Sequence, residues 1–174
     1  MKKVSIFSSS NRTDNKTKIF SETYANLLDE QGIESQICTL EQLPSKLSGT
    51  DMYAFDNEVM QEIVEKYLSS VDKLVFVVPE YNGSFPGILK LFIDAIRPVN
   101  FAGKKAALVG ISSGRSGNLR GMDHLTGILN YIKVDVYHHK LPIASINDML
   151  DGDQVTDEEV LKRLQQQIRG FMKF

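Results

Sequence analysis

Polar residues and glycines follow an apolar run near the middle of this sequence, and their types suit the binding of a flat, polar molecule. The stretch 79–87 reads Pro-Glu-Tyr-Asn-Gly-Ser-Phe-Pro-Gly, directly after the apolar run 74–78 and directly before the largely apolar stretch 88–96. This order predicts a buried strand, a polar turn and a helix. In an open parallel sheet, ligands bind at the carboxyl ends of the strands. The aromatic ring of Tyr81 offers a planar heterocycle a face or an edge.

A second polar turn, 8–17, contains no apolar side chain and follows a predicted strand at 4–7. Free backbone N–H groups and the helix dipole at the start of the next helix favour an anion. Arg12 can add a forked, charge-assisted contact to phosphate oxygens. The glycine pattern of a P-loop is absent, so a nucleoside-triphosphate site is not expected. A solvated loop with a Thr or Asp cap is the alternative, and Asp14 counts against an anion unless it points away.

A third turn, 112–117, is rich in serine and glycine and follows a predicted strand at 106–111. Its glycines permit close backbone approach to a ligand. The three turns follow the first, third and fourth strands, which are neighbours in the expected sheet, so together they line one crevice. Two alternatives stay open: Glu80 is a structural acceptor for loop amides, and Arg115 is a surface cation.

Strands and helices alternate along the chain, which predicts a parallel sheet covered by helices on both faces. With five strands and no glycine-rich dinucleotide fingerprint, we expect an α/β, flavodoxin-like three-layer sandwich, with a five-stranded parallel sheet of order 2-1-3-4-5. No linker divides residues 1–174, so a single domain is expected. The predicted strands are 4–7, 33–40, 73–78, 106–111 and 134–137, and the predicted helices are 17–31, 57–68, 86–97, 120–131 and one that begins with the capping box Thr156–Glu159.

Composition and charge exclude several classes of function. The chain has 174 residues, 42% of them apolar, and a net charge of −2 without blocks of like charge. Nucleic acid and membranes are therefore not expected partners, and the longest apolar run is too short to span a bilayer. Cys38 is the only cysteine. Without a signal-peptide pattern or a disulfide, a reducing, cytoplasmic location is expected.

These motifs resemble the NADPH-dependent FMN reductase family, a flavodoxin-like group that includes quinone, chromate and azo-dye reductases. The segment 9–12, with Asn15 and Thr17, is similar to the family's Gly-Ser-x-Arg phosphate loop. The stretch 79–90 is nearly the family's signature, and 113–117 resembles its third flavin loop. The chain departs from the family pattern in two places: Ser9 stands where glycine is common, and Asn15 where serine is common.

The resemblance implies FMN as the cofactor, with NADPH or NADH as the hydride donor and a small acceptor such as a quinone, free flavin, dye or metal oxyanion. It places the phosphate near Ser10, Arg12, Asn15 and Thr17. It places the isoalloxazine ring against Pro79, Glu80, Tyr81, Asn82 and Gly83 on one side and against Ser113, Gly114, Arg115 and Gly117 on the other.

No catalytic side chain is required for this chemistry, because hydride passes from nicotinamide to flavin N5 and the cofactor supplies the reactivity. Backbone N–H groups in 81–83 or 113–117 are predicted to stabilise the negative charge of the reduced flavin. His124, His138 and His139 do not form a metal set. The alternatives are a non-enzymatic FMN electron carrier and a catalytically silent flavin- or nucleotide-binding module.

The predicted helix 86–97 is apolar on most sides, and only Lys90, Asp94 and Arg97 mark a narrow polar face. Such a helix needs cover beyond one sheet face. We therefore expect a homodimer through this helix, with a tetramer as the larger assembly; burial within its own domain is the alternative. The irregular region 44–57 forms either a rim over the flavin or an ordered surface loop.

Overall fold

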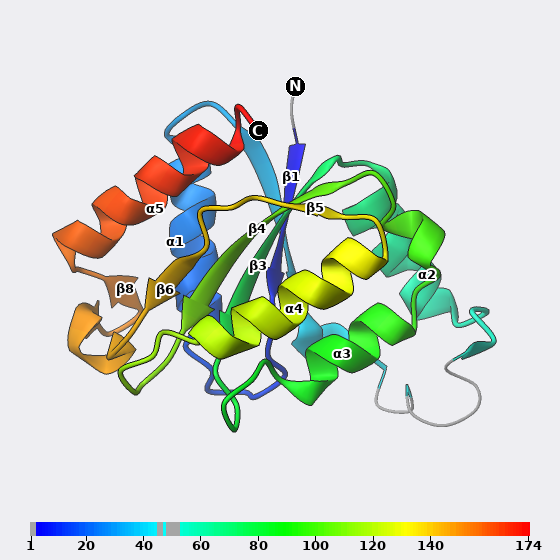
Figure 1. Ribbon diagram of the computed structural model, residues 1–174, viewed down its shortest axis with the longest axis horizontal. Coiled ribbons are helices and arrows are strands. Elements are labelled where there is room, and N and C mark those ends of the chain that lie inside the picture. Colours follow the sequence, from blue (N-terminus) through cyan, green and yellow to red (C-terminus); the bar gives the residue numbers. More distant parts are fainter. Residues whose placement is uncertain (1–2, 45–46, 48–52) are drawn as a thin grey trace.

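Five parallel strand positions form the central sheet of the computed structural model (Figure 1). The structure describes residues 3–44, 47 and 53–174. The sheet has the order β2-β1-β3-β4-β5, which confirms the predicted topology and the flavodoxin-like fold. The strands are β1 (Lys3–Ser8), β2 (Glu34–Thr39), β3 (Lys73–Pro79), β4 (Lys105–Ile111) and β5 (Asp135–Val136).

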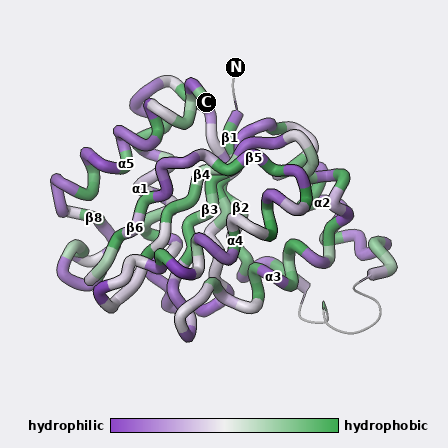
Figure 2. Tube along the Cα trace, viewed as in Figure 1, coloured by the Kyte–Doolittle hydropathy of each residue, from purple (hydrophilic) through white to green (hydrophobic). Residues whose placement is uncertain are grey.

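Helices cover both faces of the sheet (Figure 1). Helices α1 (Thr17–Asp29) and α5 (Glu158–Phe171) pack on one face, and α2 (Glu58–Val64), α3 (Gly87–Asp94) and α4 (Leu119–Tyr131) pack on the other. Figure 2 shows apolar residues concentrated along the central strands. The β3 residues 74–78 are fully buried. Burial on both faces explains why this strand is a continuous apolar run in the sequence.

The fifth strand position is split into two short pieces beside β4. Strand β5 pairs with Lys105 and Ala106, whereas β6 (Leu141–Ile143) pairs in parallel with 109–111. The predicted strand 134–137 covers only the first piece, and β6 was missed. Pro142 at the centre of β6 has no N–H to donate to a neighbouring strand, and a proline therefore argues against predicting a strand from the sequence. At the edge of a sheet a proline is tolerated. As a result, β6 lies beside the carboxyl end of β4, where the site is expected.

The interruption between β5 and β6 is bridged by a buried side chain of α5. Gln167 donates through Nε2 to the carbonyl oxygens of Leu108 at 3.0 Å and His139 at 2.8 Å. Its Oε1 accepts from the hydroxyl of Tyr24 at 3.3 Å. Gln167 therefore satisfies carbonyl groups that an unbroken fifth strand would otherwise pair.

Several predicted helix ends differ from the structure: α1 ends at Asp29 rather than at residue 31, and α2 gives way after Val64 to a π-helical turn. Helix α3 ends at Asp94 rather than at residue 97, because Arg97 precedes Pro98 and is held in an extended conformation. The capping box at Thr156 is wrong by one residue: the N-cap of α5 is Asp157, whose carboxylate accepts from Val160 N at 2.9 Å.

No helix in the described parts of the chain is long and apolar enough to cross a membrane. The remaining elements are 3₁₀ turns at Leu40–Gln42, Pro98–Asn100 and Ile146–Met149, a π-helical turn at Glu65–Ser69, and the hairpin of β7 (Leu150–Asp151) and β8 (Gln154–Val155).

Candidate functional site

A cleft of about 320 Å³ opens at the carboxyl ends of β1, β3 and β4. Loops after all three strands line it, as the sequence predicts. Ile146 and Asn147, which follow β6, also line the cleft and were missed, because β6 itself was not recognised. The predicted residues that line the cleft are Arg12, Asn15, Thr17, Pro79, Glu80, Tyr81 and Ser113.

The start of α1 forms one end of this cleft and is suited to an anion. Lys16, the N-cap residue, offers no side-chain cap, and the first turn contains no acidic residue. The hydroxyl of Thr17 is buried and has no hydrogen-bond partner among the described residues. A buried hydroxyl without a partner is costly unless a ligand pairs with it. In the first helical turn the N–H of Lys18 already donates to Asn15 Oδ1 at 3.2 Å. Together with the other N–H groups of this turn, the Thr17 hydroxyl fits the phosphate group of FMN.

Ser10 and Tyr81 join the first loop to the second. Their hydroxyl oxygens lie 2.7 Å apart, and the backbone N–H of Arg12 donates to Ser10 Oγ at 3.3 Å. Ser10 is fully buried and lies outside the cleft lining. Ser10 therefore fixes the Tyr81 hydroxyl and holds the two loops in register.

Residues 81–84 form a tight hairpin that the sequence reasoning did not anticipate. Tyr81 and Ser84 exchange backbone hydrogen bonds of 2.8 and 3.1 Å, and Asn82 and Gly83 have φ angles of 52° and 75°. This is the Asn-Gly geometry of a type I′ turn. Asn82 and Gly83 form its tip and do not line the cleft. Ser84 Oγ also lies 2.9 Å from His124 Nδ1, which ties the hairpin to α4.

Glu80 is a structural acceptor for the third loop. Its Oε2 accepts from the Ser116 hydroxyl and from the Asn118 N–H at 3.2 Å. The amide of Asn118 in turn donates to the carbonyl oxygens of Val78 at 3.0 Å and Pro79 at 3.1 Å. Glu80 also lines the cleft. It therefore links the end of β3 to the loop that follows β4.

The predicted residues of the third loop differ in role. Gly117 has a φ of +58° and packs against β6, so its side-chain position faces protein rather than the cleft. Its N–H donates to Ser112 Oγ at 2.9 Å, and is therefore not available to a ligand. Gly114 faces open space. Arg115 is exposed and forms no ion pair within the described residues, which favours the surface-cation alternative.

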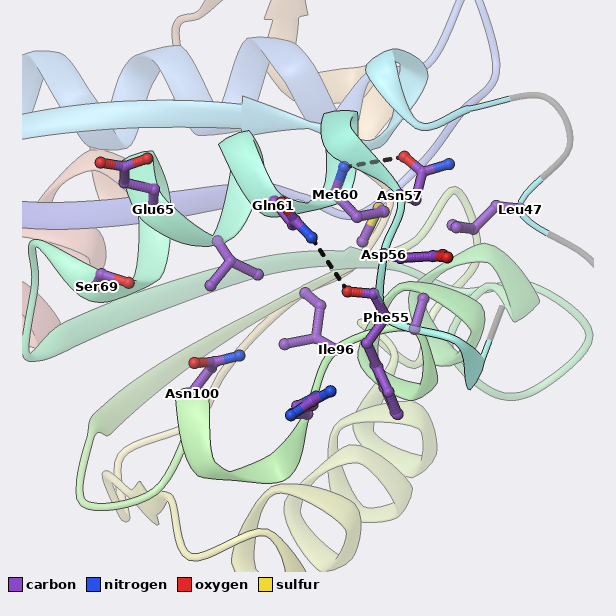
Figure 3. A pocket seen from close by; sticks show the side chains of 13 residues that line it. Leu47, Phe55, Asp56, Asn57, Met60, Gln61, Glu65, Ser69, Ile96 and Asn100 are labelled. Carbon is purple, nitrogen blue, oxygen red and sulfur yellow. Dashed lines mark hydrogen bonds between the residues drawn. The ribbon is translucent and has the colours of Figure 1, made fainter. Parts of the chain in front are cut away.

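A second cavity of about 240 Å³ lies between α2 and the segment that follows α3 (Figure 3). The ring of Phe55 lies 5.1 Å from the Arg97 guanidinium, and Gln61 donates to the Phe55 carbonyl at 3.4 Å. None of the residues around this cavity lines the cleft. For Phe55 the packed-loop alternative therefore fits better than a rim over the flavin, while Met52 of the same region lies outside the described residues.

Comparison with known proteins agrees with this geometry. The family model of the NADPH-dependent FMN reductases matches residues 2–148. An NAD(P)H-dependent FMN reductase of Pseudomonas aeruginosa is 32% identical over 144 residues, 80% of this chain and 77% of the relative. A 2-hydroxy-1,4-benzoquinone reductase of Burkholderia is 29% identical, over 65% of each chain. The flavoenzyme NAD(P)H:(acceptor) oxidoreductase FerB of Paracoccus denitrificans superposes with a TM-score of 0.82 at 26% identity, covering 99% of this chain and 96% of that one.

The sheet order and the cleft at its carboxyl edge define a flavodoxin-like α/β protein. Within that class, the chain belongs to the NADPH-dependent FMN reductase family. This confirms the family resemblance derived from the sequence, together with the assignment to FMN- and NAD(P)H-dependent oxidoreductases.

Proposed function

We propose that residues 1–174 act as one domain that uses FMN in the cleft to reduce a small acceptor at the expense of NADPH or NADH. The observation that carries this proposal is the buried, unpartnered hydroxyl of Thr17 in the first turn of α1, inside a cleft shared by three strand ends. Bound FMN supplies the redox chemistry, accepting hydride from the nicotinamide and passing electrons to the acceptor. The Burkholderia relative, a benzoquinone reductase, supports a quinone as that acceptor.

The residues of the chain bind and orient the cofactor in this proposal. Thr17, the N–H groups of the first α1 turn and Arg12 hold the phosphate. Pro79, Tyr81 and Ser113 contact the ring, and Glu80 fixes the third loop beside it. The N–H groups of Tyr81 and Gly117 already have partners in the protein. Because Asn82 and Gly83 lie outside the cleft lining, we assign the stabilisation of the charge on the reduced ring to N–H groups of 113–116.

Visible spectroscopy tests the proposal directly. The purified protein is mixed with FMN, excess flavin is removed, and NADPH is added anaerobically in a stopped-flow instrument. Rapid bleaching of the flavin absorption, followed by reoxidation with a benzoquinone, is the expected result. Slow reduction by NADPH, and by NADH in a parallel experiment, would favour the electron-carrier alternative. Protein that retains no flavin at any concentration would reject the site.

Replacement of Thr17 by valine is expected to have opposite effects on ligand binding and on stability. The variant should bind FMN roughly 5-fold more weakly, because one hydrogen bond to the phosphate is worth about 1 kcal/mol. The flavin-free protein should become slightly more stable, because a buried hydroxyl without a partner is removed. Fluorescence titration and urea unfolding measure the two effects. Riboflavin, which lacks the phosphate, is the matched control and should bind both proteins equally.

We also propose a homodimer through α3 and α4. Ile88 and Leu91 of α3 are only half-buried, and a groove of about 630 Å³ separates α3 from α4. Its rim includes Tyr131, which is 88% exposed, and Tyr53, which is 61% exposed. Exposed aromatic side chains around a groove are typical of protein interfaces.

Light scattering at micromolar concentration checks this proposal. The expected mass is twice the 19.6 kDa of the chain, and four times that mass would indicate the tetramer. Tyr131→Asp should dissociate the dimer, because it places a charge in the apolar interface. Lys162→Asp is the control, because Lys162 lies on the exposed face of α5. This variant should leave the mass unchanged. A wild-type monomer would reject the dimer.

A reducing, cytoplasmic location is proposed from the state of Cys38. The thiol is buried and accepts a hydrogen bond from Gln42 Nε2 at 3.1 Å. Burial raises the pKa of the Cys38 thiol to about 12, so it is protonated at neutral pH and unreactive. Nothing about this buried thiol requires an oxidising compartment.

A further inference from the structure

Two carboxylates of this chain contact side chains assigned to the FMN phosphate, Arg12 by the proposed function and Asn15 by the family resemblance. Asp14 Oδ1 lies 3.8 Å from Arg12 Nε. Glu41 Oε1 accepts a hydrogen bond of 2.7 Å from the amide nitrogen of Asn15, which also donates to the Arg12 carbonyl. Only Thr17, among these side chains, has no partner within the described residues. Two of the predicted phosphate-binding side chains, Arg12 and Asn15, are therefore already engaged by carboxylates of the protein itself.

These carboxylates come from separate parts of the fold and meet at the same end of the cleft. Asp14 belongs to the loop after β1 and lines the cleft. Glu41 belongs to the 3₁₀ turn after β2, the neighbouring strand in the sheet. The order of the sheet thus places a second acidic residue beside the phosphate loop, although 26 residues separate it from Asn15.

Exposure decides how strongly the carboxylates hold their partners. Arg12 and Asp14 side chains are 64% and 79% exposed, and ion pairs in such positions contribute only about 0–1 kcal/mol. A phosphate can therefore displace them. After displacement, the negative charges of Asp14 and Glu41 still lie beside a doubly charged phosphate. They also offset the positive charges of Arg12 and Lys16.

We propose that Asp14 and Glu41 compete with the phosphate of FMN, so that FMN binds as an exchangeable ligand and is only weakly preferred over riboflavin. This inference rests on the proposed function, because it concerns the same site. Physically, each carboxylate occupies a donor that the phosphate needs and repels the phosphate once it is bound. The two acidic residues therefore set the affinity for FMN without contributing to contacts with the ring.

The test compares FMN with riboflavin in charge-neutral variants. We expect Asp14→Asn and Glu41→Gln each to bind FMN roughly 5-fold more tightly than wild type, as expected for removal of one solvent-screened charge within a few ångströms. Their affinity for riboflavin should not change. Glu158→Gln is the matched control: it breaks an exposed ion pair with Lys162 at 3.6 Å on α5 and should leave both affinities unchanged.

The outcomes separate this inference from the proposed function. Wild-type protein that binds FMN, with variants that bind it no more tightly, would overturn the competition and leave the flavin site intact. Equal gains for FMN and riboflavin would also overturn it, because the carboxylates would then act on the ring end. Wild-type protein that binds neither flavin would overturn both proposals. Rising salt should shrink the difference between Asp14→Asn and wild type, because the competing charges are exposed.

Discussion

Replacement of Gly117 by alanine is expected to lower the free energy of unfolding by about 2–5 kcal/mol. Gly117 has a φ of +58°, a conformation that costs other residues roughly 1–2 kcal/mol. An added Cβ would lie 2.7 Å from Pro142 Cβ and 2.8 Å from the backbone nitrogen of Ile143. Because both neighbours belong to the backbone or ring of β6, neither can move aside easily, and overpacking of this kind costs about 1–3 kcal/mol.

Urea unfolding followed by circular dichroism measures the loss, which should shift the midpoint and leave the slope unchanged. Gly114→Ala is the control within the same loop. A Cβ at Gly114 meets nothing within 4 Å, so this change should not destabilise the protein. It should leave the free energy of unfolding unchanged or raise it by a few tenths of a kcal/mol, because alanine restricts the unfolded chain more than glycine does. Similar losses in the two variants would show that the loop needs glycine for flexibility in general, rather than for contact with β6.

The contrast between these glycines shows where sequence reasoning stops. Both were predicted to let the backbone approach the flavin, and nothing in the sequence separates them. The distinction depends on β6, which Pro142 disguises as a non-strand. Without β6, the neighbour of Gly117 and the contribution of Ile146 to the cleft could not be predicted.

The parts that were predicted correctly are those with a strong local signal. Buried parallel strands such as β3 are continuous apolar runs, and the polar turn after each strand must lie at the same edge of the sheet. These two facts located the strands and the cleft, and the strand order followed from right-handed crossovers and the absence of a dinucleotide fingerprint. Hydrogen-bond partners such as Asn15 with Glu41 join separate turns of the chain, and no local pattern predicts such pairs.

Replacement of Glu80 by alanine is expected to weaken FMN binding roughly 10- to 30-fold, because two hydrogen bonds to its carboxylate hold the third loop in place. Each of these hydrogen bonds contributes about 1–2 kcal/mol, and screening by solvent reduces this contribution. The change leaves the Ser116 hydroxyl and the Asn118 N–H without their acceptor. Glu80→Gln retains one carbonyl oxygen as an acceptor and should lose only about 3-fold. Fluorescence titration with FMN measures both variants, and circular dichroism confirms that each remains folded.

A double-mutant cycle between Glu80 and Ser116 identifies how Glu80 acts. If Glu80 works by holding the loop, Ser116→Ala alone should already weaken FMN binding, and the two changes together should cost less than their sum, because both break the same hydrogen bond. If Glu80 contacted the flavin ring directly, the two losses would add. Additive losses would therefore contradict the structural role, and they would move Glu80 from the support of the third loop to the surface that binds the ring.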